Sequence, residues 1–170
     1  VGDRVAETEV VVVGGGPVGW RKVQGLIEAG ARVRLITPRS LSRGKNLPGL
    51  EILQREFRSG DLGGAFLAFA ATNDRAVNAA VTAEARREKI PVNVADAPQD
   101  GDFSLPARFC RGDLTVAVST SGKSPAFAAL VKDYLAGTVG DEWAAFLEIA
   151  AAIRQKMLAG DRGSLASGDI

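Results

Sequence analysis

The chain has 170 residues, of which 46% are hydrophobic and 24% charged, and its 21 basic and 20 acidic side chains give a net charge of +1. These proportions are typical of a globular domain and exclude a disordered, collagen-like or low-complexity chain. A near-neutral chain has no overall field that would hold nucleic acid or an anionic membrane. No apolar run approaches the roughly 20 residues of a membrane span, and the N-terminus lacks the layout of a signal peptide.

Strands and helices alternate over the first two thirds of the chain. Four consecutive valines end the first predicted strand, and such a β-branched run is typical of a strand buried on both faces of a parallel sheet. The predicted strands are 9–13, 31–38, 52–53, 65–71 and 91–95. The first predicted helix follows the first strand and ends near residue 29, and the second spans residues 74–89. This alternation predicts an α/β fold with a Rossmann-like doubly wound parallel sheet.

The pattern changes near Pro106. A strand is expected at 114–119, followed by a polar loop at 119–123. Ser124 and Pro125 then favour the start of a helix, because serine caps a helix N-terminus and proline suits its first turn. A second helix is expected over 142–158, and the Gly/Ser/Asp-rich tail from residue 160 is expected to fray.

A glycine-rich turn follows the valine strand. Gly14, Gly16 and Gly19 have the Gly-x-Gly-x-x-Gly spacing of dinucleotide-binding turns. The first glycine allows the tight turn, the second lets the backbone approach a pyrophosphate, and the third lets the helix pack closely. The context of strand, turn and amphipathic helix favours dinucleotide binding; the alternative is a glycine-rich turn with no ligand.

The end of the second strand leaves the choice of cofactor open. An NAD-binding fingerprint usually has an acidic residue there to hold the ribose hydroxyls. This chain has Thr37, Pro38 and Arg39 instead. Arg39 is suited to a 2′-phosphate and so to NADP, or it is a solvated loop residue, with the ribose held by backbone groups around Pro38 and Arg39.

Polar residues also follow the fourth and fifth strands, at the edge where parallel sheets bind ligands. Thr72, Asn73 and Asp74 either contact the cofactor or cap the next helix, and the two roles do not exclude each other. Asp96 is either a turn former or a carboxylate beside the nicotinamide that can take a proton.

The chain has a single cysteine, Cys110, and no histidine. One thiol cannot form an internal disulfide, so we expect a cytoplasmic protein with Cys110 as a small core residue. The lack of histidine excludes a Ser-His-Asp triad, a Cys-His pair and a histidine-ligated zinc site. The sequence predicts no fixed metal site.

Four ordered motifs resemble those of the precorrin-2 dehydrogenase family, the dehydrogenase/ferrochelatase module of siroheme synthases. The motifs are residues 10–19 with Arg21 and Lys22, residues 70–74 with Val77 and Asn78, residues 91–96, and residues 118–125, with Phe103 and Pro106 between the last two. The sequence departs from the family pattern at Gly19, Trp20 and Ser121, where the family usually has alanine, a polar residue and glycine.

The resemblance implies NAD-dependent oxidation of precorrin-2 to sirohydrochlorin, and in some members Fe²⁺ insertion, with Asp96 as the catalytic residue of both reactions. It implies NAD contacts at Pro17, Val18, Pro38 and Arg39, which favours NAD as the cofactor. It also implies a homodimer that exchanges the segment after Pro106. The expected organisation is an NAD-binding domain over 1–106, a dimerisation segment over 107–137 and a short C-terminal helical segment over 138–170.

The implied substrate has eight carboxylates, which basic side chains suit well. The predicted substrate-binding residues are Asn93, Arg108, Ser119, Lys123 and Ser124, with Arg21, Lys22, Arg43, Lys45 and Arg111 as further basic candidates. Each basic residue has the alternative of a solvated surface charge, and the loop around Lys123 has the alternative of only capping the next helix.

Two other functions are alternatives to this interpretation. A non-enzymatic NAD(H)-sensing module would share the glycine turn, but such modules normally keep the acidic residue after the second strand and do not need Asp96 together with the 119–125 motif. A Tyr-Lys short-chain reductase is excluded, because the only tyrosine, Tyr134, has no lysine four residues further on.

Overall fold

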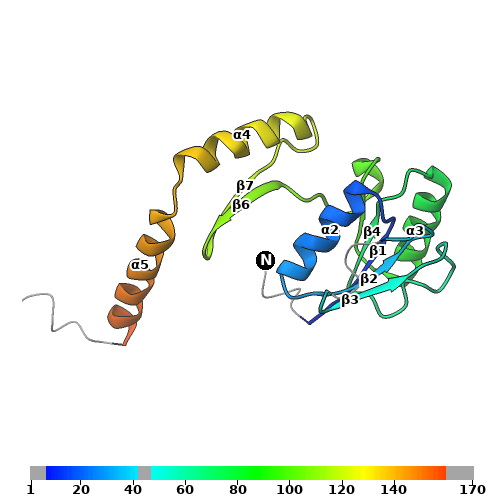
Figure 1. Ribbon diagram of the computed structural model, residues 1–170, viewed down its shortest axis with the longest axis horizontal. Helices are drawn as coiled ribbons and strands as arrows, with labels where there is room; N and C mark the ends of the chain where they lie inside the picture. Colours follow the sequence, from blue (N-terminus) through cyan, green and yellow to red (C-terminus); the bar gives the residue numbers. More distant parts are fainter. Residues whose placement is uncertain (1–6, 42–46, 160–170) are drawn as a thin grey trace, which may run out of the picture. The chain divides into compact units, whose positions relative to one another are not determined.

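The computed structural model describes residues 7–41 and 47–159 and divides into two compact units, Val1–Ser104 and Leu105–Ile170. The first unit is an α/β domain (Figure 1). Its elements in chain order are β1 (Glu9–Val13), α2 (Pro17–Glu28), β2 (Arg32–Ile36), β3 (Leu50–Leu53), β4 (Leu67–Ala70), α3 (Arg75–Glu88), β5 (Val92–Val94) and the 3₁₀ turn η1 (Pro98–Asp100). Each predicted strand and helix of this unit is present, with ends that differ by at most two residues.

All five strands of the first unit are parallel and lie in the order β3-β2-β1-β4-β5. β1 therefore lies in the middle, and its valines are buried on both faces as the sequence predicts. Val11 and Val13 belong to the apolar cluster under α3, whereas Val10 and Val12 belong to the cluster under α2. This confirms the Rossmann-like parallel sheet, with its carboxyl edge formed by the ends of β1, β4 and β5.

The connection from β3 to β4 is held to α3 by a buried carboxylate. The side chain of Glu84 accepts hydrogen bonds from the N–H groups of Gly60 (3.0 Å) and Leu62 (2.9 Å). Within the same connection, Asp61 accepts two hydrogen bonds of 2.7 Å from Arg55. These bonds from Arg55 hold the pKa of the Asp61 carboxyl below its ordinary value of 3.8. The loop is thus fixed by charge-assisted hydrogen bonds rather than by apolar packing alone.

Residues 105–159, the described part of the second unit, form a β-hairpin and two helices. Its elements are β6 (Ala107–Arg111), β7 (Leu114–Val118), α4 (Pro125–Thr138) and α5 (Glu142–Leu158). Ser124 caps α4 by accepting a hydrogen bond from the N–H of Phe127, as predicted. Strand β6 was not predicted. Its signal is the Gly112–Asp113 pair between two alternating runs, because Arg111 pairs with Leu114 across a two-residue turn.

Apolar side chains of the second unit are exposed rather than buried. α5 buries no residue and α4 buries only Ala128. The exposed large apolar side chains on these two helices are Phe127, Leu130, Tyr134, Trp143, Phe146, Ile149, Ile153, Met157 and Leu158. Cys110 is also exposed, so its prediction as a core residue is wrong. The alternation along β6 places Cys110 on the exposed face of a two-stranded sheet.

None of the helices in the described part of the chain is long and apolar enough to cross a membrane. The predicted tail from residue 160 lies outside the described residues.

Candidate functional site

The glycine turn joins the end of β1 to the start of α2. Gly14 has a φ of +115°, and a Cβ there would lie 2.4 Å from the carbonyl oxygen of Ala71 at the end of β4. Gly19 has as little space for a side chain, since a Cβ added there would lie 1.9 Å from the carbonyl oxygen of Gly14. Both positions therefore exclude a side chain, which explains the first and third glycines of the motif.

The middle glycine of the motif has a different environment. A Cβ at Gly16 would meet no atom within 4 Å, so the space beside this residue is open. Gly16 is also the N-cap of α2, with no side chain capping the helix and no acidic residue in its first turn. A helix N-terminus with open space and no carboxylate beside it fits the pyrophosphate of a dinucleotide. Pro17 and Val18, also predicted to bind the cofactor, form the first turn of this helix.

The end of β2 contributes a buried threonine and two exposed residues. Thr37 is buried, lies against Gly15, and accepts a hydrogen bond of 3.2 Å from the backbone N–H of Arg39. Pro38 and Arg39 are exposed beyond it. Thr37 thus fixes the backbone of the segment predicted to hold the ribose, a role that the sequence did not indicate. The contacts of Pro38 and Arg39 with the cofactor stay a prediction.

The end of β4 leads directly into α3. Asp74 caps this helix, since its Oδ1 accepts hydrogen bonds from the N–H groups of Ala76 (2.8 Å) and Val77 (3.4 Å). Asn73 is exposed, and the hydroxyl of Thr72 accepts a hydrogen bond of 3.1 Å from the N–H of Asp74. The capping role is therefore confirmed for Asp74, and a further contact of 72–74 with the cofactor stays a prediction.

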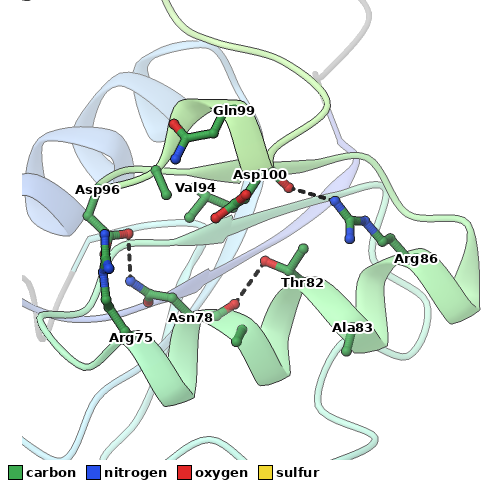
Figure 2. Close-up of a pocket in the computed structure, with 11 residues that line it drawn as sticks. Arg75, Asn78, Thr82, Ala83, Arg86, Val94, Asp96, Gln99 and Asp100 are labelled. Atoms are coloured by element: carbon green, nitrogen blue, oxygen red, sulfur yellow. Dashed lines mark hydrogen bonds and ion pairs between the residues drawn. The ribbon is translucent and has the colours of Figure 1, made fainter.

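Asp96 follows β5 and faces α3. Figure 2 shows Asp96, Arg75 and Asn78 at one end of a cavity of about 450 Å³ between α3 and the segment from β5 to η1. The Asn78 Nδ2 donates a hydrogen bond of 2.8 Å to Asp96 Oδ1, and Asp96 Oδ2 lies 3.9 Å from Arg75 Nε. The Asp96 side chain is 36% exposed. A partly exposed carboxylate at the carboxyl edge of the sheet is able to exchange a proton with a bound molecule.

Asn93 lies on the opposite face of β5 and is buried. Its Oδ1 accepts a hydrogen bond of 2.7 Å from Lys22 Nζ, and its Nδ2 donates one of 2.8 Å to the carbonyl oxygen of Phe103. Burial lowers the pKa of the Lys22 ammonium below its ordinary value, and the nearby charge of Arg21 acts in the same direction. The structure gives Asn93 an internal role, and its predicted contact with substrate stays a prediction.

The other predicted substrate residues belong to the second unit. Lys123 is exposed in the loop before α4, and Ser124 is the cap of that helix. Ser119 accepts a hydrogen bond of 3.2 Å from the N–H of Ser121 in the same loop. Arg108 is exposed on β6. The structure thus confirms the capping role of the loop, and substrate binding by these residues stays a prediction.

The further basic candidates differ in their surroundings. Arg111 donates hydrogen bonds to the carbonyl oxygens of Val139 (3.1 Å) and Ala136 (2.8 Å), so it closes the end of α4 rather than standing free for a ligand. Arg21 is exposed on α2. Arg43 and Lys45 lie outside the described residues. Residues 7–41 and 47–159 hold no group of three His, Cys, Asp or Glu side chains that could bind a metal ion.

The site geometry agrees with comparisons to known proteins. A family profile described as "Putative NAD(P)-binding" matches residues 4–107, which include the glycine turn and Asp96. This chain belongs to that NAD(P)-binding family. A second profile, "Sirohaem biosynthesis protein central", matches residues 111–137 of the second unit. The resemblance to the dehydrogenase module of siroheme synthases is thereby confirmed.

Curated relatives of this NAD(P)-binding chain are siroheme synthases. The protein from Ectopseudomonas mendocina is 44% identical over 124 residues, which are 72% of this chain and 27% of the relative. The protein from Photobacterium profundum is 37% identical over 150 residues, which are 86% of this chain and 32% of the relative. The chain therefore spans about a third or less of these relatives.

A solved structure also resembles this NAD(P)-binding chain. SirC, precorrin-2 dehydrogenase, matches with a TM-score of 0.74 and 27% sequence identity, covering 96% of this chain and 80% of the SirC chain. The match extends over both units of the sequence.

Sequence reasoning missed two residues beside Asp96. The sequence places Asn78 in a motif without indicating a role for it, and it gives no indication of a role for Arg75. The signal for Asn78 was available: it is a polar residue on the helix face that also presents Val81 and Ala85, and all three are buried. A polar side chain on a buried face requires a partner, because a buried amide without hydrogen bonds is costly.

Proposed function

We propose that this chain oxidises precorrin-2 to sirohydrochlorin with NAD⁺ as the electron acceptor. The observation behind this proposal is the partly exposed Asp96 carboxylate at the same edge of the sheet as an open glycine turn. The proposal is supported by the similarity to SirC, precorrin-2 dehydrogenase, over 96% of this chain and to a siroheme synthase over 72% of it.

The reaction removes one hydride and one proton from the substrate. The chemistry that a bound dinucleotide supplies is acceptance of the hydride at its nicotinamide ring. The chain holds the pyrophosphate through the open backbone at Gly16 and the start of α2. Asp96 takes the proton from a second bond to hydrogen, whose electron pair stays in the new double bond of the product, and later passes the proton to solvent. The products are sirohydrochlorin, NADH and one proton, so electrons and atoms balance.

Anaerobic absorbance measurements with purified protein, precorrin-2 and NAD⁺ test the proposal. We expect sirohydrochlorin to form with NAD⁺ faster than with NADP⁺, and to form at least about 100-fold more slowly in Asp96→Ala, since general-base catalysis contributes about 10²–10⁴. Glu88→Gln, a change to an exposed carboxylate on α3, the helix that Asp96 faces, is the control and should react like the wild type.

Two outcomes would contradict the proposal. Wild-type activity in Asp96→Ala would exclude Asp96 as the base. NAD⁺ binding without any oxidation would instead favour the NAD(H)-sensing module. Adding Fe²⁺ as a substrate to the same cuvette tests whether the chain also inserts iron, since sirohaem would then form.

We also propose that the chain acts in the cytoplasm as a homodimer formed through the second unit. Burying the exposed apolar side chains of α4 and α5 against a second copy would remove them from water. The Phe146 side chain is 65% exposed and Ile149 is 58% exposed on α5. Sedimentation should give a dimer for wild type and a monomer for Phe146→Glu. Arg154→Glu on the same helix is the control and should remain dimeric, and a monomeric wild type would refute the proposal.

A further inference from the structure

Asn78 is one of the few buried polar residues in the described part of the chain, at 3% exposure, and both polar atoms of its amide have hydrogen-bond partners. Its Oδ1 accepts from the backbone N–H of Thr72 at 3.2 Å and lies 2.7 Å from the Thr72 hydroxyl. Its Nδ2 donates to the carbonyl oxygen of Thr72 at 3.1 Å and to Asp96 Oδ1 at 2.8 Å. The amide therefore joins the end of β4 to the residue that follows β5.

The orientation of this amide is determined by the backbone of Thr72. A backbone N–H only donates and a carbonyl oxygen only accepts, so Asn78 must turn its oxygen to the first and its nitrogen to the second. The reversed amide would place its oxygen against both the Thr72 carbonyl and the Asp96 carboxylate. One N–H of the Asn78 amide therefore always points to Asp96, and Asp96 Oδ1 accepts a hydrogen bond from it.

We propose that Asn78 is the positioning residue of Asp96. Its buried amide holds Asp96 Oδ1 at a fixed distance from the end of β4 and leaves Oδ2 on the side of Arg75 and the cavity (Figure 2). Asp96 needs such a support because it lies in a loop and its side chain is partly exposed. An untethered carboxylate would sample several rotamers, and a misplacement of 1 Å is able to cost about 10²-fold in rate.

This inference rests on the proposed function, and it predicts a specific division of kinetic effects. Asn78→Ala removes the tether to Asp96 together with the hydrogen bonds to Thr72, and it alters no residue of the glycine turn or of the start of α2. We expect kcat for precorrin-2 oxidation to fall about 10- to 100-fold, while the KM for NAD⁺ stays within about 3-fold of wild type. A kcat within 3-fold of wild type, in a folded variant, would overturn the inference.

A loss of stability alone must be separated from a loss of position. Glu84→Gln is the matched control, because Glu84 is a buried polar residue on the same helix whose hydrogen bonds go to the β3–β4 connection. This variant should unfold at a lower urea concentration than wild type but keep its kcat under folding conditions. If Glu84→Gln loses as much kcat as Asn78→Ala, the role of Asn78 is only structural.

An exchange of the two side chains tests the contact itself. Asn78→Asp places two acceptors against each other, so we expect a lower urea midpoint. Adding Asp96→Asn restores one donor and one acceptor, and the double variant should regain part of the lost stability while staying inactive. No regain would refute the tether. If wild-type protein does not oxidise precorrin-2, the proposed function and the catalytic part of this inference both fail, while the urea midpoints still decide whether the contact exists.

Discussion

Gly14 and Gly16 are two residues apart, yet alanine should lower the stability at the first position and the NAD⁺ affinity at the second. At Gly14 the φ of +115° is unfavourable for alanine, and the new Cβ would lie 2.4 Å from the backbone oxygen of Ala71. Backbone strain of about 1–3 kcal/mol and overpacking of about 1–3 kcal/mol both apply, and neither is relieved by a side-chain rotation. We expect Gly14→Ala to lower the free energy of unfolding by about 2–6 kcal/mol.

At Gly16 the backbone has φ −71° and ψ 179°, a conformation that alanine adopts readily, and the Cβ would enter open space. Alanine lowers the conformational entropy of the unfolded chain, which stabilises the folded state by about 0.4–1 kcal/mol. Alanine is also a poorer N-cap than glycine, and this cancels a similar amount of the stabilisation. The free energy of unfolding should therefore change by less than about 1 kcal/mol. A methyl group there obstructs the approach of a pyrophosphate to the backbone, so NAD⁺ affinity should fall by about tenfold or more.

Urea unfolding and calorimetric titration with NAD⁺ measure the two effects separately. Gly60→Ala is the control, because Gly60 has a φ of +98° with no atom within 4 Å of the Cβ position and so isolates backbone strain from the clash. Gly14→Ala should be less stable than Gly60→Ala. The reasoning is refuted if Gly14→Ala unfolds at the wild-type midpoint, or if Gly16→Ala binds NAD⁺ as tightly as wild type.

Three further predictions concern the same unit. Gly19→Ala introduces the residue usual in the family, but its Cβ would meet the Gly14 carbonyl oxygen at 1.9 Å, so a lower thermal midpoint is expected despite the helix propensity of alanine. Because Arg55 lowers the pKa of Asp61, this carboxylate stabilises the fold above pH 3.8 and loses that effect as the pH falls through its folded-state pKa. Asp61→Asn should therefore have a lower urea midpoint than wild type near neutral pH, with a difference that shrinks below pH 3.8; a constant difference would contradict this. Glu84→Ala leaves two loop N–H groups without an acceptor and should cost about 2–4 kcal/mol in urea unfolding, whereas wild-type stability would mean that water replaces the carboxylate.

Local patterns predicted most of the first unit correctly. The valine strand, the glycine turn and the cap at Asp74 each depend on residues within a few positions of one another. Burial of β1 on both faces followed from its unbroken apolar run, since only a strand in the middle of a parallel sheet accommodates one. The cap at Ser124 was predictable for the same reason, because a capping side chain contacts the helix turn that follows it.

The second unit was less predictable. The apolar face of α5 has the periodicity of a packed helix, but Trp143 and Phe146 are 49% and 65% exposed. A periodic apolar face indicates that a helix packs against something and does not specify what it packs against. The prediction that Cys110 is a core residue fails for a related reason. Its burial depends on what covers the hairpin, because two strands alone bury neither face.

The sequence by itself determined the order of strands and helices in the first unit, the glycine turn and the identity of Asp96 as the carboxylate at the edge of the sheet. These follow from periodicity, backbone preference and motif spacing, which act over short stretches of chain. Only the tertiary structure decided that Asn78 holds Asp96 from 18 residues away and that Lys22 holds Asn93 from 71 residues away. Both contacts arise because the parallel sheet places β4 beside β5, with α3 packed on one face and α2 on the other, and no local rule specifies which polar side chains then meet.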